Sequence, residues 1–141
     1  MERKMIKKII LVVCFLGISA ISFAGVKPLD QKVIAYYFHG TRRCPTCLKL
    51  EQYSKEAIEK NFPAELVSGE LEFRAINLEN KGNEHFVNDY RLYTKSLILS
   101  LVKSGKEVKS KNLVAIWELV GNKEKFSKYV KEEVIGFLKG P

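Results

Sequence analysis

Cysteine and histidine are scarce in this chain, which limits the metal sites that it can build. Among its 141 residues there are three cysteines and two histidines. Cys44 and Cys47 form the only C-x-x-C pair, and neither His39 nor His85 stands at zinc-finger spacing from it. Together they supply the ligand types of a Cys2His2 site. A metal-binding module therefore stays an alternative, although the spacing of a zinc motif is absent.

The chain also lacks repeats, low-complexity segments and clusters of basic residues interleaved with aromatic ones. These absences argue against a repeat protein, a disordered tail and a nucleic-acid-binding surface. The length suits one domain, and 46% hydrophobic and 28% charged residues are typical of a globular protein with a core. We therefore expect a single folded domain and no nucleic-acid partner.

The first 24 residues have the features of an export signal. Their basic residues all precede position 9, residues 9–24 are apolar or small, and Ser22-Phe23-Ala24 ends the stretch. The apolar part is shorter than the ~20 residues of a typical membrane-spanning helix. We expect a signal peptide cleaved after Ala24, a domain over 25–141, and a location in the periplasm or at the outer face of the cytoplasmic membrane. An uncleaved anchor is the alternative.

Removing this segment leaves Cys44 and Cys47 as the only cysteines, because Cys14 lies within it. The segment carries four basic residues and one acid, so the net charge falls from +8 to +5. A disulfide across two intervening residues closes a very small loop and constrains the unfolded chain little. The pair is therefore a poor staple and favours a redox role.

The hydrophobic pattern predicts an alternating order of strands and helices along the chain. The predicted strands are residues 32–39, 71–78, 96–102 and 107–109. The predicted helices are residues 45–62, ended by Pro63, then 84–91, capped by Asn83, then 113–120, and a last helix through 126–138. Trp117 and the aromatic residues of the last helix are interpreted as core. This order predicts an α/β fold, a mixed four-stranded sheet with helices on both faces.

A C-x-x-C pair at a strand-to-helix junction carries a resemblance to a known family. Residues 33–39 form the buried strand, Gly40 breaks it, and Cys44-Pro45-Thr46-Cys47 begins the helix. Residues 96–107, a strand followed by a turn, match the second half of the same pattern. The chain resembles the thioredoxin-like family over nearly all of residues 25–141. The resemblance implies a thioredoxin-like fold and a thiol-disulfide oxidoreductase.

A narrower resemblance is carried by the string Tyr36-Tyr37-Phe38-His39-Gly40-Thr41-Arg42-Arg43-Cys44. It is similar to the exported ArsF-type thioredoxin-like subunits associated with nitrophenyl-compound nitroreductases. That likeness implies an electron carrier that serves a membrane or periplasmic reductase partner. It does not imply that this chain itself binds a nitroaromatic compound.

Three positions depart from the thioredoxin pattern. Arg43 stands where many thioredoxins have a tryptophan before the first cysteine. Thr94-Lys95-Ser96 occupies the region of their cis-proline, and residues 33–38 contain no acid. These departures weaken the expectation of general thioredoxin activity but leave the dithiol chemistry intact.

The site chemistry follows from the position of the pair at a helix N-terminus. Unpaired N–H groups and the helix dipole stabilise a thiolate at Cys44, and Arg42 and Arg43 add positive charge. We expect Cys44 to be the attacking nucleophile and Cys47 the more buried resolving thiol. No cofactor is expected besides this disulfide, and the expected partner is a protein thiol or disulfide.

Four further residues are candidates for tuning the thiolate or binding a partner: Arg43, Lys95, Ser96 and His39. Arg43 is equally consistent with a solvated loop residue, because exposed charges are screened. His39 is a candidate proton shuttle for Cys47, with a packed strand end as the alternative. A docking module that keeps the fold without turnover is a third function, and loss of activity in Cys44→Ser separates it from an oxidoreductase.

Overall fold

The computed structural model describes residues 29–140. The predicted export signal and its cleavage after Ala24 lie outside these residues. None of the helices in the described range has the length and apolar character of a membrane span.

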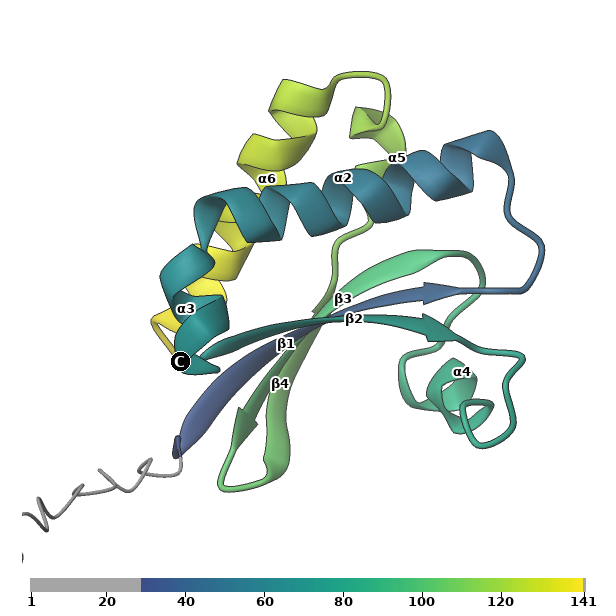
Figure 1. Cartoon of the computed structure of the whole chain (residues 1–141). Helices are drawn as coiled ribbons and strands as arrows, with labels where there is room; N and C mark the ends of the chain where they lie inside the picture. Colours follow the sequence, from purple (N-terminus) through teal and green to yellow (C-terminus); the bar gives the residue numbers. More distant parts are fainter. Residues whose placement is uncertain (1–28, 141) are drawn as a thin grey trace, which may run out of the picture.

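Four strands form one mixed sheet at the centre of the molecule. They are β1 (Gln31–His39), β2 (Leu71–Asn77), β3 (Ser96–Lys103) and β4 (Lys106–Asn112), in the spatial order β2-β1-β3-β4. Strand β1 pairs with β2 in parallel and with β3 antiparallel, and β3 pairs with β4 antiparallel. The parallel pair requires a crossover, which the first helices supply. Figure 1 shows the sheet with its strands labelled.

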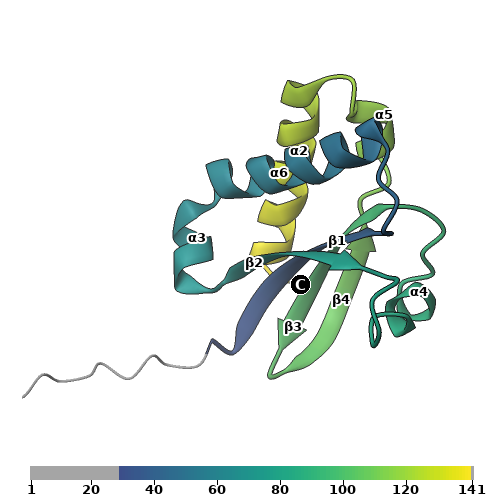
Figure 2. The ribbon, with the colours of Figure 1, turned by 45° about the vertical axis from the view of Figure 1, so that its right-hand side comes forward.

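Helices cover both faces of this sheet, but unequally. Helices α2 (Pro45–Asn61) and α6 (Lys123–Leu138) lie over one face, together with the short α3 (Pro63–Ser68) and α5 (Ile116–Leu119). The five-residue α4 (His85–Asp89) lies at the other face (Figures 1 and 2). The predicted α/β class, with a mixed sheet of four strands and helices on both faces, is confirmed.

Strand β1 is buried on both sides, which is why its sequence is apolar without alternation. Val33, Ala35 and Tyr37 point into the main core, with α2 and α6. Phe38 points to the opposite face, where it packs in a smaller cluster with Leu92 and Ile98. Side chains packed on both faces thereby fix β1, and its C-terminal end fixes the position at which the following loop begins.

Three sequence expectations about secondary structure need correction. Pro63 begins α3 instead of only ending a helix, because proline is well tolerated at the first helical position. Asn83 does not cap α4; its side-chain amide donates to the carbonyl of Asn77. The return strand β4 spans seven residues, and a bulge opposite Leu101 and Val102 interrupts its register.

Trp117 is also placed differently from the prediction, since it is 36% exposed on α5. Its indole N–H donates to the carbonyl of Lys95 at 3.0 Å, so its polar edge ties α5 to the segment before β3. Phe126 and Phe137 on α6 are buried, as expected for core residues. Trp117 therefore lies at the surface next to the core, where it links α5 to the segment before β3.

Candidate redox site

Cys44 and Cys47 form a disulfide at the N-terminus of α2. Their Cα atoms are 5.0 Å apart, within the normal range for bridged cysteines. Cys44 is the N-cap residue, with extended backbone, and its Sγ accepts the backbone N–H of Cys47 at 3.1 Å. Pro45 occupies the first helical turn, where it has no N–H to leave unpaired. The chain thus aims a helix N-terminus at the first sulfur.

The two cysteines differ in exposure. Cys44 is exposed, whereas Cys47 is only 5% exposed. An incoming disulfide can therefore reach Cys44, while Cys47 is shielded beneath it. The first turn of α2 contains no acidic residue that would oppose a thiolate there.

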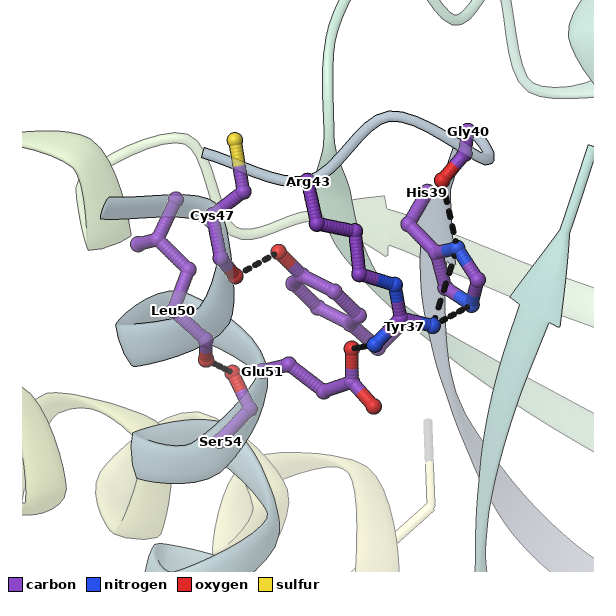
Figure 3. A network of polar contacts seen from close by, with 8 residues as sticks. All are labelled: Tyr37, His39, Gly40, Arg43, Cys47, Leu50, Glu51 and Ser54. Atoms are coloured by element: carbon purple, nitrogen blue, oxygen red, sulfur yellow. Dashed lines mark hydrogen bonds and ion pairs between the residues drawn. The ribbon is translucent and has the colours of Figure 1, made fainter. Parts of the chain in front are cut away.

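Tyr37 supports the buried cysteine from below. Its hydroxyl donates to the carbonyl of Cys47 at 2.9 Å, and its ring is fully buried. Burial raises the pKa of Tyr37 well above its usual value, with a smaller contribution from Glu51, so the hydroxyl keeps its proton and remains a donor. This bond ties strand β1 to the first turn of α2. Figure 3 shows the contact.

Arg43 is bound between the helix and the strand. Its guanidinium forms an ion pair with Glu51 of α2, and its Nη2 lies within hydrogen-bond distance of both ring nitrogens of His39, 3.1 Å from Nδ1 and closer to Nε2. The other ring nitrogen of His39, Nδ1, lies 3.0 Å from the carbonyl of Gly40, where it can only act as a donor. In Figure 3 the Arg43 side chain runs down to Glu51 and His39, while the Sγ of Cys47 points the other way.

The other end of the loop is held by Glu79. The backbone N–H of Thr41 donates to Oε1 of Glu79 at 3.1 Å, and the Asn77 amide donates to the Thr41 hydroxyl at 3.1 Å. A Cβ at Gly40 would lie 2.6 Å from the same Oε1, so a larger residue would displace the carboxylate. Hydrogen bonds from Thr41 lower the pKa of Glu79, with smaller contributions from Lys95 and Arg42. The loop between β1 and α2 is thus clamped at both ends.

Lys95 and Ser96 lie at the same end of the sheet as this loop, where β3 begins beside the end of β1. Ser96 pairs with Phe38 at the end of β1, and its hydroxyl donates to the carbonyl of Thr94 at 2.9 Å. Lys95 lines a small cavity of about 190 Å³ together with His39 and Gly40. No peptide bond between residues 29 and 140 is cis. The segment before β3 is therefore built without the cis-proline of many thioredoxins.

The side chains of the metal-binding alternative are not brought together. His39 is occupied by Gly40 and Arg43, and His85 lies on α4, where it contacts Gly82 and Asp89. Across the part of the chain that the structure describes, no group of three or more His, Cys, Asp or Glu side chains is placed to hold a metal ion.

The strand order β2-β1-β3-β4, the parallel β1–β2 pair and a C-x-x-C disulfide at the start of the helix after β1 together define a thioredoxin-like fold. No protein-family model matches the chain, and no curated protein matches it significantly.

Similar solved structures are distant. A thioredoxin from Fasciola hepatica has 21% sequence identity and a TM-score of 0.40, covering 70% of this chain and 81% of its own. A malarial protein has 16% identity and a TM-score of 0.39, covering 62% of this chain and 94% of its own. The thioredoxin-like fold is defined by the topology of this chain and not by these likenesses.

Two site residues had no clear signal in the sequence. Tyr37 looked like one apolar residue among several in β1, and Glu51 like one charge among many on α2. The only available hint for Tyr37 was that it alternates with Val33 and Ala35, which places it on the face that α2 covers. Glu51 lies four residues after Cys47, so it shares a helix face with it.

Proposed function

We propose that this chain is an exported thiol-disulfide oxidoreductase that carries electrons through the Cys44–Cys47 pair. The observation that carries the proposal is the arrangement of the disulfide at the N-terminus of α2, with Cys44 exposed and Cys47 buried. An exposed sulfur at a helix N-terminus is suited to nucleophilic attack. A shielded second sulfur within bonding distance is suited to resolving the intermediate.

The reaction transfers two electrons to a protein disulfide. The Cys44 thiolate attacks one sulfur of the partner disulfide, which forms a mixed disulfide and releases one partner thiolate. The Cys47 thiolate then attacks Sγ of Cys44, which closes the Cys44–Cys47 bond and releases the second partner thiolate. A dithiol protein restores the reduced form by the same two steps in reverse. In this proposal Arg43, His39, Lys95 and Ser96 tune the thiolate or bind the partner, and the Cys44–Cys47 disulfide is the redox group.

The proposed partner is a membrane-bound or periplasmic reductase, and the proposed location is outside the cytoplasm. The sequence of residues 1–24 supports export. The likeness of the string from Tyr36 to Cys44 to ArsF-type subunits supports a nitrophenyl-compound reductase system as the electron acceptor. In this role the chain delivers electrons and does not bind the nitro compound.

Trapping of the mixed disulfide tests the proposal. Cys47→Ala removes the resolving thiol, so the full chain should accumulate disulfide-linked partners through Cys44 in cells that export it. Non-reducing electrophoresis and mass spectrometry identify the linked proteins, and Cys44→Ser/Cys47→Ala is the matched control. Absence of any species specific to Cys47→Ala, together with full activity of Cys44→Ser, would show a docking module in place of an oxidoreductase.

A further inference from the structure

Arg42 and Arg43 precede Cys44, and Arg43, the nearer of the two, forms an ion pair with the carboxylate of Glu51. The ion pair between Arg43 and Glu51 spans eight positions and joins the loop to the second turn of α2. The two side chains are partly shielded, at 30% and 22% exposure. Such a pair is screened less by salt than one on the open surface. The positive charge of Arg43 is therefore partly offset by the Glu51 carboxylate.

His39 fixes the direction of this guanidinium. The Arg43 Nη2 lies against both ring nitrogens, and because the Gly40 carbonyl can only accept from Nδ1, Nε2 is the nitrogen of a neutral ring that can accept from Arg43. His39 is only 6% exposed, so its ring has little freedom to turn away. Glu51 of α2 and His39 of β1 thus hold Arg43 from two elements at once, and its side chain runs away from the direction in which the Cys47 sulfur points (Figure 3).

We propose that Glu51 is a positioning residue for the redox centre: it offsets the charge of Arg43 and, with His39, directs its guanidinium away from the Cys47 sulfur, so that less positive charge stabilises the Cys44 thiolate. This inference rests on the proposed function and concerns the direction of electron flow. A less stabilised thiolate makes the reduced form a better electron donor. The charge beside Cys44 is thereby set by a residue of α2 and not by the loop arginine alone.

The remaining charged groups around the loop fit the same account. Arg42 and Lys95 face Glu79, whose pKa they help to lower after the hydrogen bonds from Thr41. Besides His39, Tyr37 is an ionisable neighbour of the Arg43–Glu51 pair, and burial raises its pKa so that it stays neutral. Each basic side chain at the loop thus has a nearby carboxylate, and Glu51 is the one in direct contact with the residue before Cys44.

A charge-pair cycle on the full chain tests this role. In a Cys47→Ala background, the rate of iodoacetamide alkylation of Cys44 is measured by peptide mass spectrometry at about pH 6, below the usual thiol pKa. Glu51→Gln should raise the rate about threefold, and Arg43→Gln should lower it about threefold, as expected for one charge added or removed nearby. The double variant should return close to the parent rate. Arg43→Lys, which keeps the charge, should stay closer to the parent than Arg43→Gln.

The control is Glu59→Gln, which removes a charge from the same helix two turns further on, where Glu59 pairs with Lys55. It should leave the rate unchanged, and thermal unfolding should show that all variants fold. With Cys47 present, Glu51→Gln should raise the reduction potential by about 14 mV, the equivalent of a threefold change in a two-electron couple. Changes of the same sign in Glu51→Gln and Arg43→Gln, or no change in either, would overturn the role of Glu51. Failure of the wild-type pair to cycle would instead overturn the proposed function.

Discussion

The two segments that meet at Cys44 are held in place by different forces. On one side, the loop of residues 40–43 has no buried side chain and is fixed by polar contacts to Glu79, Glu51 and His39. On the other side, α2 is fixed by apolar burial, with Leu50 and Ile58 fully inside the core. The chain thus joins an apolar, buried support for Cys47 (helix α2) to a loop before Cys44 that is held by polar contacts at the surface. This division suits the proposed roles of Cys47 as the resolving thiol and Cys44 as the attacking thiol.

The largest contrast between the two segments should appear in the cysteines themselves. Cys44→Ser should reduce disulfide-reductase turnover by at least about two orders of magnitude, because no attacking thiol remains. Cys47→Ser should also stop turnover, but only after one attack, because the mixed disulfide cannot resolve. Single-turnover kinetics with a fluorescent disulfide separates the two. An attack phase that survives in Cys44→Ser would show that Cys44 is not the attacking nucleophile.

The apolar support should dominate stability. Leu50→Ala should lower the free energy of unfolding by about 2–5 kcal/mol, since it leaves a cavity under a fully buried side chain. Leu48, two residues earlier on the same helix, is 49% exposed. Leu48→Ala should therefore cost at most about 0.5 kcal/mol. Urea unfolding measures both, and equal losses would contradict the packing described for α2.

Tyr37 links the support to the buried cysteine, and its hydroxyl should have a smaller effect. Tyr37→Phe removes the donor to the Cys47 carbonyl without emptying the core, so the expected loss in unfolding free energy is about 1 kcal/mol. Tyr93→Phe is the matched control, because Tyr93 is 96% exposed. Amide hydrogen exchange in the first turn of α2 should rise in Tyr37→Phe alone. Unchanged exchange there would show that the hydroxyl does not brace the turn.

The polar clamp at Glu79 should respond to acid before the core does. Because the folded pKa of Glu79 is lowered, its contribution is present above the ordinary Glu pKa of about 4.3 and is lost as the pH falls through the lower folded value. We expect exchange of the Thr41 amide to increase in that acidic window while the β1 amides stay protected. Glu79→Gln should show a weaker pH dependence, whereas Glu70→Gln should behave as wild type. Simultaneous loosening of loop and strand would remove the distinction between them.

The sequence predicted strand β1 and helix α2 better than it predicted the contacts of the loop that precedes Cys44. Strand β1, helix α2 and the junction at Cys44 follow from local patterns: an apolar run, an apolar stripe of helical period, and a C-x-x-C pair with Pro45. The contact of Arg43 with Glu51 could not be predicted, because it depends on how a loop folds back on a helix. The type and spacing of Trp117 predict a core position, but its ring is 36% exposed and its indole N–H donates to the backbone carbonyl of Lys95 at the surface.

The Arg43 prediction shows the same limit. The sequence places a positive charge next to Cys44, and on that basis alone the charge would stabilise the thiolate. In the structure Arg43 forms an ion pair with Glu51 and a hydrogen bond with His39. The effect of Arg43 on the thiolate remains a prediction, and its size now depends on a residue of α2.

The equilibrium reduction potential of the Cys44–Cys47 pair tests the central claim most directly. The full chain would be equilibrated with dithiothreitol or glutathione buffers and the two forms separated by thiol labelling. We predict a reversible two-electron titration at a potential between those of thioredoxin, about −270 mV, and DsbA, about −120 mV. A reduction potential below about −300 mV, as structural disulfides have, would contradict a redox role for the pair.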